Sequence, residues 1–210
     1  MFKIIKKEPL NPSMTRMVIE APFVARKAMP GQFIILRVNE TGERIPLTIA
    51  DYDREAGTVT IIYQKVGKST LLLDEQEAGG YLMDFIGPLG KASELEGYKK
   101  AAVIGGGAGC AIAYPQAKAL HAMGTKVDMI AGFRDKDLII LENEMREASD
   151  RLIVMTDDGS NGNKGFVTAA LQKNIDEGAD YDLVIAIGPI PMMKAVSNLT
   201  KPYGIKPSSA

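Results

Sequence analysis

The feature that most constrains the fold is a regular alternation of apolar, strand-like runs and helical segments from residue 99 onward. The expected strands cover residues 101–104, 126–131, 151–155 and 182–187, and helices are expected before Gly124 and at 138–148, 165–176 and 192–199. Strands that are apolar along their whole length are typical of a parallel sheet covered by helices on both faces. This half therefore predicts an α/β doubly wound parallel sheet.

The first half of the chain has short β-rich runs separated by turn residues such as Pro30-Gly31 and Thr41-Gly42. The runs occupy residues 15–20, 32–38, 47–50 and 57–64, and a helix is expected from Ser69 to Leu73. Close spacing with turn signals predicts an antiparallel β-barrel or sandwich. With a boundary near residues 96–98, we expect two domains, 1–97 and 98–210.

Composition excludes several classes of protein. The chain has 210 residues and a net charge of −1, so no general attraction to nucleic acid or anionic membranes is expected. A single cysteine, Cys110, excludes an internal disulfide framework. No apolar run reaches the ~18 residues of a membrane span. The N-terminus lacks a secretory signal, so the cytoplasm is the expected location.

Glycines cluster where the first parallel strand meets its helix, at Gly105, Gly106, Gly107 and Gly109. Glycine lets the backbone approach a ligand, and a helix N-terminus offers free N–H groups to phosphate. Cys110 stands where the GxGxxG fingerprint needs its third glycine, so the position in the fold carries the prediction of a nucleotide site. The alternative is a tight turn without a ligand. Gly188-Pro189 ends the fourth strand similarly, and both loops are expected to face one cleft.

Three other positions in this half have chemical potential. Asp157 and Asp158 follow the third strand and are either paired carboxylates or, as we favour, part of a turn. Cys110 is either a redox thiol at a helix start or, as we favour, a small residue packed under the loop. His121 lies late in its helix, away from the strand ends, and is interpreted as a surface residue.

Two segments of the first half suit a phosphorylated ligand. Arg44 offers a planar fork to phosphate, and Thr48 offers a hydroxyl beyond the rigid Pro46. The alternative is a surface arginine before an edge strand. Residues 67–70 precede the expected helix, where they either hold a pyrophosphate or simply cap the helix. Residues 87–90 are expected to form a second rigid turn.

Six segments occur in one order along nearly the whole chain: Pro30-Gly31-Gln32-Phe33, Arg44 to Thr48, Gly67 to Thr70, Gly87-Pro88-Leu89-Gly90, the glycine cluster, and Gly188-Pro189 followed by Met192. Together they resemble the ferredoxin–NADP reductase superfamily. Within it, the chain is most similar to two families of electron-transfer subunits. One is the small subunit of NADH-dependent ferredoxin:NADP oxidoreductase, also known as a sulfide dehydrogenase subunit. The other is the electron-transfer subunit of dihydroorotate dehydrogenase. Residues 43–51 and 114–120 resemble the first more.

The resemblance implies that the barrel binds FAD and that the second domain binds NAD(H), with NADP(H) as an alternative. It implies cofactor-binding roles for Arg44, Ile45, Pro46, Leu47, Thr48, Ile62, Tyr63, Gln64, Gly67, Lys68, Ser69, Thr70, Gly106, Gly107, Gly109, Gly188, Pro189 and Met192. Arg44 would bind phosphate, and residues 46–48 would line the flavin. Relatives often have cysteine before the Gly-Pro pair, where this chain has Ile187. The cofactors carry the chemistry, so no catalytic side chain and no metal ligand is assigned.

These features predict a flavin-dependent oxidoreductase subunit that passes electrons between NAD(P)H and FAD, and onward to a larger redox partner subunit or a ferredoxin-like acceptor. Both families continue into a cysteine-rich [2Fe–2S] segment, which needs four thiolates that this chain alone cannot supply. The alternative function is therefore a non-catalytic flavin- or nucleotide-binding module that has lost its electron exit. Residues 204–206 are expected to begin an incomplete fifth strand, which leaves an open edge for a partner or a second copy.

Overall fold

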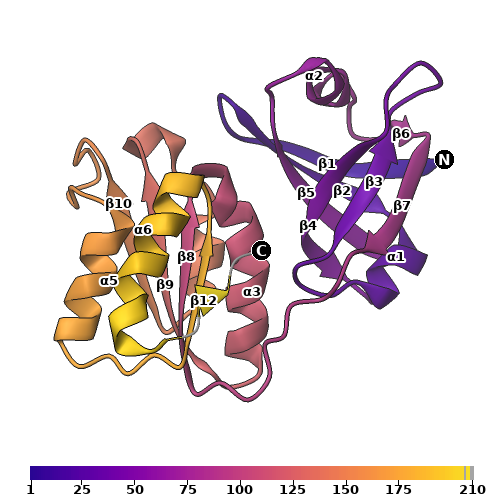
Figure 1. The fold of residues 1–210 in the computed structure, drawn as a ribbon. Coiled ribbons are helices and arrows are strands. Elements are labelled where there is room, and N and C mark those ends of the chain that lie inside the picture. Colours follow the sequence, from indigo (N-terminus) through magenta and orange to yellow (C-terminus); the bar gives the residue numbers. More distant parts are fainter. Residues whose placement is uncertain (206, 209–210) are drawn as a thin grey trace. The chain divides into compact units, whose positions relative to one another are not determined.

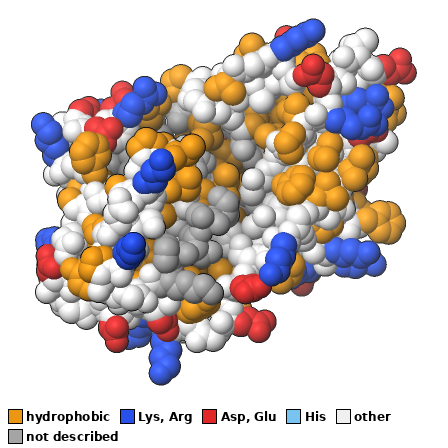
Figure 2. All heavy atoms as spheres, viewed as in Figure 1, with side chains coloured by type: hydrophobic (Ala, Val, Ile, Leu, Met, Phe, Trp, Pro, Cys, Tyr) orange, Lys and Arg blue, Asp and Glu red, His pale blue; other side chains and the backbone are white. Residues whose placement is uncertain are grey.

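The computed structural model describes residues 1–205 and 207–208. The chain separates into two compact units, Met1–Ser93 and Glu94–Ala210 (Figure 1). Each unit has its own hydrophobic core. Within the described residues, no helix is long and apolar enough to cross a membrane. Figure 2 shows both basic and acidic side chains on the viewed face.

The first unit is a nearly closed antiparallel β-barrel, as the sequence predicts. Its seven strands pair in the order β6-β1-β2-β5-β4-β3-β7. The strands are β1 (Phe2–Asn11), β2 (Met14–Glu20), β3 (Phe33–Arg37), β4 (Ile45–Asp53), β5 (Thr58–Gln64), β6 (Tyr81–Leu82) and β7 (Asp84–Leu89). Two short helices, α1 (Pro22–Lys27) and α2 (Lys68–Asp74), interrupt them. Alternate residues of β2, β4 and β5 face a core that includes Met17, Ile49 and Ile61.

The sequence prediction of a rigid turn at residues 87–90 was wrong. Gly87, Pro88 and Leu89 complete β7, and Leu89 pairs with Phe33 of β3. Only Gly90 leaves the strand, with a positive φ of 79°. Proline is tolerated here because β7 is the last strand of the sheet order, so no ladder bond is required of it on the outer side.

The second unit is a parallel sheet with the order β10-β9-β8-β11-β12, which confirms the predicted α/β class. Its strands are β8 (Lys100–Gly106), β9 (Lys126–Phe133), β10 (Arg151–Thr156), β11 (Leu183–Ile187) and β12 (Pro207–Ser208). The helices are α3 (Cys110–Ala122), α4 (Glu142–Glu147), α5 (Val167–Asp176) and α6 (Ile190–Thr200). Helices α5 and α6 share one core with the sheet, through Leu171, Val196 and Ile104 (Figure 1).

Two elements of this unit differ from the prediction. The helix expected at 138–148 is shorter, because Leu141 adopts a left-handed φ of 55° and α4 begins only after it. A 3-10 turn, Lys136–Leu138, covers the start of the expected segment. The fifth strand lies at Pro207–Ser208 instead of beginning at 204–206, of which Lys206 lies outside the described residues. It pairs with Val184 and Ile185, so the edge of β11 is covered there and not left open.

Candidate functional site

Strand β4 presents alternate side chains to the two faces of the barrel wall. Ile45 and Leu47 pack against the core, and Ile49 is fully inside it. Pro46 and Thr48 therefore point to the outer face, because successive side chains of a strand alternate. The resemblance groups residues 46–48 together as a flavin-lining segment. The structure divides them, since Leu47 contributes its side chain to the core and only Pro46 and Thr48 offer theirs to a ligand.

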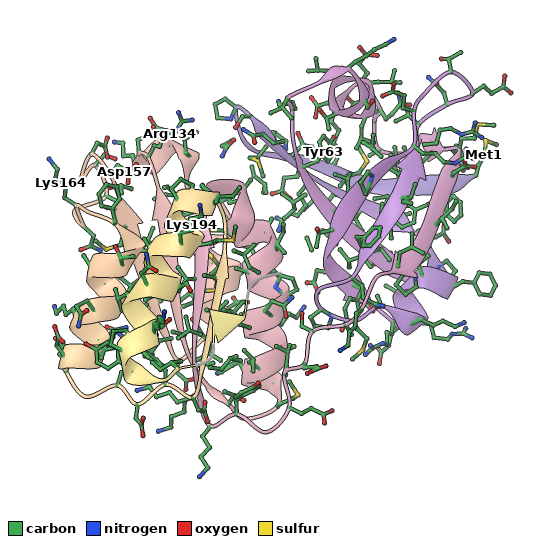
Figure 3. All side chains as sticks on the ribbon, in the orientation of Figure 1. Met1, Tyr63, Arg134, Asp157, Lys164 and Lys194 are labelled. Atoms are coloured by element: carbon green, nitrogen blue, oxygen red, sulfur yellow. The ribbon has the colours of Figure 1, made fainter. Side chains whose placement is uncertain are left out.

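Strand β5 divides its predicted ligand residues in the same way. Tyr63 is only 2% exposed and lies in the core (Figure 3). Its hydroxyl donates a hydrogen bond to Asp74 Oδ1 at 3.1 Å. Burial first, and then the charge of Asp74, raise the pKa of Tyr63 above its ordinary value. Ile62 and Gln64 alternate with Tyr63 and face outward, so a contact of Tyr63 with a ligand is restricted to its backbone.

Arg44 stands immediately before β4 and is held by a carboxylate. Its Nη2 donates to Asp84 Oδ2 at 2.8 Å, while 55% of its side chain stays exposed. The same oxygen lies 2.8 Å from Nε of Arg37 on β3. A guanidinium has five N–H donors, so Arg44 keeps donors for an anion after this contact is made. The sequence did not single out Asp84, which lies 40 positions from Arg44.

The start of α2 lies beside the Arg44 turn. Ser69 donates its hydroxyl hydrogen to Glu43 Oε2 at 3.0 Å, so two segments that the sequence predicted separately meet here. Thr70 is used differently, because its Oγ1 accepts from the N–H groups of Val66 and Gly67 and donates to the Gly67 carbonyl. Thr70 therefore caps the helix, whereas Ser69 has a single exposed partner that a ligand can replace. Lys68 is exposed in the first turn of α2.

Gly67 provides a direct test of whether this surface fits a phosphorylated ligand. A Cβ built on it would meet no atom within 4 Å, and its φ of −156° suits any residue. Neither packing nor backbone strain inside the protein therefore requires glycine at this position. An open glycine two residues before Ser69 leaves room for a ligand to approach the backbone at the start of α2.

The far end of α2 is anchored by Asp74. Oδ1 accepts hydrogen bonds from Thr15 at 2.7 Å and Tyr63 at 3.1 Å, and Oδ2 lies 3.7 Å from Lys65 Nζ. Lys7 also donates to the Asp74 backbone carbonyl. Burial alone would raise the pKa of Asp74, but the two hydroxyl donors and both lysines outweigh it and lower the pKa. These contacts join α2 to three strands and so fix where its first turn lies.

In the second unit, the two predicted glycine loops touch each other. Gly105 and Gly106 are the last residues of β8, and Gly107–Gly109 form a 3-10 turn that leads into α3. A Cβ on Gly109 would lie 2.3 Å from the Ile187 carbonyl oxygen, and one on Gly188 would lie 3.1 Å from Gly106 Cα.

The same loops bring Met192 to the glycine turn. A Cβ on Gly106 would lie 2.5 Å from Met192 Sδ and 3.1 Å from Pro189 Cδ. Gly107 is open, with no atom within 4 Å of a built Cβ and a positive φ of 54°. The residues of this unit to which the resemblance gives a dinucleotide-binding role are thus adjacent in space. They lie at the carboxyl ends of β8 and β11, where ligands of such sheets bind.

The remaining candidates of the second unit take structural positions. Cys110 is buried, its pKa is raised by burial to about 12, and it packs under Gly105, so its thiol stays protonated near neutral pH. Asp158 accepts a hydrogen bond from the Ser160 N–H, which places the Asp157-Asp158 pair in a turn. His121 lies near Asp150 with a partly exposed side chain. Arg134 and Asp157 lie with Lys164 at one end of the unit (Figure 3).

Comparison with known proteins identifies the family of the chain. The oxidoreductase NAD-binding domain family matches residues 103–198. A protein encoded in the adh 3′ region of Clostridium beijerinckii is 49% identical over 98% of this chain and 72% of its own length. A dihydroorotate dehydrogenase B (NAD(+)) electron transfer subunit homolog of Thermotoga maritima is 41% identical over 97% of this chain and 71% of its own length.

A solved structure extends the agreement to both units. A chain of the NADH-dependent reduced ferredoxin-NADP oxidoreductase superposes with a TM-score of 0.92 and 38% identity. The match covers 100% of this chain and 75% of that one. The chain therefore belongs to the ferredoxin–NADP reductase superfamily, among the electron-transfer subunits of dihydroorotate dehydrogenase and their homologues.

Proposed function

We propose that this chain is an electron-transfer subunit that moves reducing equivalents between a nicotinamide dinucleotide and FAD, and onward to a partner protein. The barrel domain, residues 1–97, holds FAD, and the α/β domain, residues 98–210, holds the dinucleotide. The observation that carries the proposal is the meeting of the Arg44 turn with the start of α2 through the Ser69–Glu43 hydrogen bond, beside the open Gly67. This arrangement offers a cation, a hydroxyl and an unobstructed backbone to one pyrophosphate.

Bound FAD and a nicotinamide dinucleotide would supply the hydride chemistry. The protein would orient each cofactor and shield it from solvent. Arg44 and Ser69 bind the pyrophosphate, while Pro46, Thr48 and Ile62 present the outer face of β4 and β5 to the ring system. Leu47 and Tyr63 act from inside the barrel by keeping that wall rigid. No side chain needs to donate or accept a proton for these roles, so we assign no general acid or base.

The dinucleotide is held where the β8 and β11 loops touch. Gly107, whose Cβ position is open, lets the backbone approach the phosphates, while Gly109 packs against Ile187 at the end of β11 and so holds the two loops together. Pro189 and Met192 lie beside Gly106, where they border the nicotinamide end. We favour NADH over NADPH as the dinucleotide. Relatives described as NAD(+) enzymes support this choice.

Some relatives are described as electron transfer subunits, which supports the proposal that this chain acts as one subunit of a larger enzyme. We propose a larger redox subunit or a ferredoxin-like protein as the acceptor.

The visible spectrum of the purified full chain tests the proposal. After incubation with FAD and removal of the excess, the protein is expected to be yellow, and anaerobic NADH is expected to bleach it. Ferricyanide should then restore the colour and be reduced in turn. Flavin binding without NADH bleaching would favour a non-catalytic binding module, and a colourless protein would refute the assignment.

The Arg44→Ala variant is expected to bind FAD roughly 10- to 150-fold more weakly, because charge-assisted hydrogen bonds contribute about 1.5–3 kcal/mol. Fluorescence quenching of FAD during titration with protein measures the dissociation constant. Arg26→Ala removes the same charge from the exposed last turn of α1 and is the matched control. Equal affinities for the two variants would remove Arg44 from the site.

The Gly67→Ala variant is expected to fold normally and to bind FAD about 10-fold more weakly. Its methyl group has no clash within the protein, so the free energy of unfolding should change by no more than about 1 kcal/mol. The methyl group would instead occupy space that the pyrophosphate needs. Calorimetric titration with FAD measures the loss, with Glu75→Ala at the other end of the helix as control. Unchanged affinity would show that the cofactor passes elsewhere.

A further inference from the structure

We infer that Asp84 is a positioning residue for the cofactor, acting through Arg44. The inference rests on the proposed function, because it takes Arg44 as the phosphate-binding side chain. Asp84 is the first residue of β7, pairs with Arg37 in the β3–β7 ladder, and is 23% exposed. Its carboxylate therefore sits on a paired strand of the barrel, whereas Arg44 lies on the turn before β4.

The geometry gives Asp84 one oxygen for two guanidinium groups. Oδ2 lies 2.8 Å from Arg37 Nε and 2.8 Å from Arg44 Nη2. Arg37 is 22% exposed and Arg44 is 55% exposed, so the inner pair is the better shielded from solvent. Arg37 holds the carboxylate by the attraction of its charge, since its buried Nε is within ion-pair distance but makes no hydrogen bond. The carboxylate in turn holds the Arg44 guanidinium at one edge through a hydrogen bond.

The charges of the three groups also favour this role. One carboxylate between two guanidinium groups leaves a net charge of +1, so the cluster still attracts a phosphate. A guanidinium fork binds phosphate best when its plane is already oriented, since ordering a long side chain on binding weakens affinity. Without Asp84, Arg44 would keep its charge but lose the contact that orients it before the ligand arrives.

Two other roles for Asp84 predict different results. A carboxylate that only stabilises β3 against β7 would affect folding and leave affinity for FAD unchanged. A carboxylate that competes with phosphate for Arg44 would weaken binding, so its removal would tighten it. Positioning predicts instead that removal weakens binding, and that this effect requires Arg44.

A double-mutant cycle on the full chain separates these roles, with FAD as the titrant. Asp84→Asn is expected to weaken binding about 3- to 10-fold in the wild-type background. In the Arg44→Ala background the same substitution should change the dissociation constant by less than about 2-fold. Thermal unfolding of all four proteins measures the stability of the barrel separately from its affinity for FAD. If Asp84→Asn fails to fold, Asp84→Glu replaces it, and weaker binding of FAD is again expected.

The outcomes distinguish this inference from the proposed function. Weakening that disappears without Arg44 supports positioning. Unchanged or tighter binding by Asp84→Asn overturns the inference, as does an equal loss in both backgrounds. Failure of the wild-type protein to bind FAD would overturn the proposed function itself, which the Asp84 variants cannot do.

Discussion

The Gly109→Ala substitution is expected to destabilise the second unit by about 3 kcal/mol, because the added methyl group would clash with neighbouring backbone atoms. Its Cβ would lie 2.3 Å from the carbonyl oxygen and 2.8 Å from the carbonyl carbon of Ile187, and both are backbone atoms. The loop after β8 and the end of β11 would have to separate. A drop in unfolding temperature on the order of 10 °C, measured by circular dichroism, is the expected result.

Gly107→Ala is the matched control for this effect. Its Cβ meets no atom within 4 Å, so it tests backbone strain alone, which for a φ of 54° costs about 1–2 kcal/mol. Gly109 has a φ of −61° and no such strain, so its whole effect comes from close approach. Stability is the quantity compared, because Gly107 also belongs to the proposed dinucleotide site. A Gly109→Ala protein as stable as the wild type would mean that the two loops are not in contact.

Replacing Asp74 by alanine is the second change with a large expected effect, a loss of about 2–4 kcal/mol from the barrel. The substitution removes the acceptor of Thr15 and Tyr63, and Tyr63 is only 2% exposed, so water is a poor replacement for that acceptor. Chemical denaturation measures the change. Tyr63→Phe, which keeps the ring and leaves Thr15 bound to Asp74, should cost clearly less. Similar losses for both variants would show that the ring, and not the carboxylate, anchors the helix.

The same residue predicts a pH dependence. Since the contacts of Asp74 lower its pKa in the folded protein, its ionised form stabilises the fold above the unfolded pKa of about 3.9. That contribution is lost as the pH falls through the lower, folded-state pKa. The wild type should therefore lose stability more steeply below about pH 4 than Asp74→Asn does. Parallel curves for the two proteins would contradict this assignment.

Local patterns were sufficient for most of the fold. The apolar runs of β8, β9, β10 and β11 and the helices between them predicted a parallel sheet, because hydrophobic periodicity reflects burial. The patterns failed where a residue's conformation depends on distant neighbours. Residues 87–90 have the composition of a turn, yet residues 87–89 belong to β7, which pairs with β3. Leu141 shortens α4 because its backbone is left-handed, a conformation that a leucine in the sequence does not predict.

For the proposed site, the sequence offered Arg44, Gly67, Ser69 and the glycines of the second unit as candidates, because a cation, a hydroxyl or a bare backbone is a property of the residue itself, and the family resemblance assigned their roles. Tertiary structure decided which of the selected side chains reach the surface, turning Tyr63 inward and Thr70 toward its own helix. It also supplied Glu43, Asp74 and Asp84, whose roles exist only through partners as far as 59 positions away. A carboxylate's function is set by the donors around it, and those donors meet only when the chain has folded.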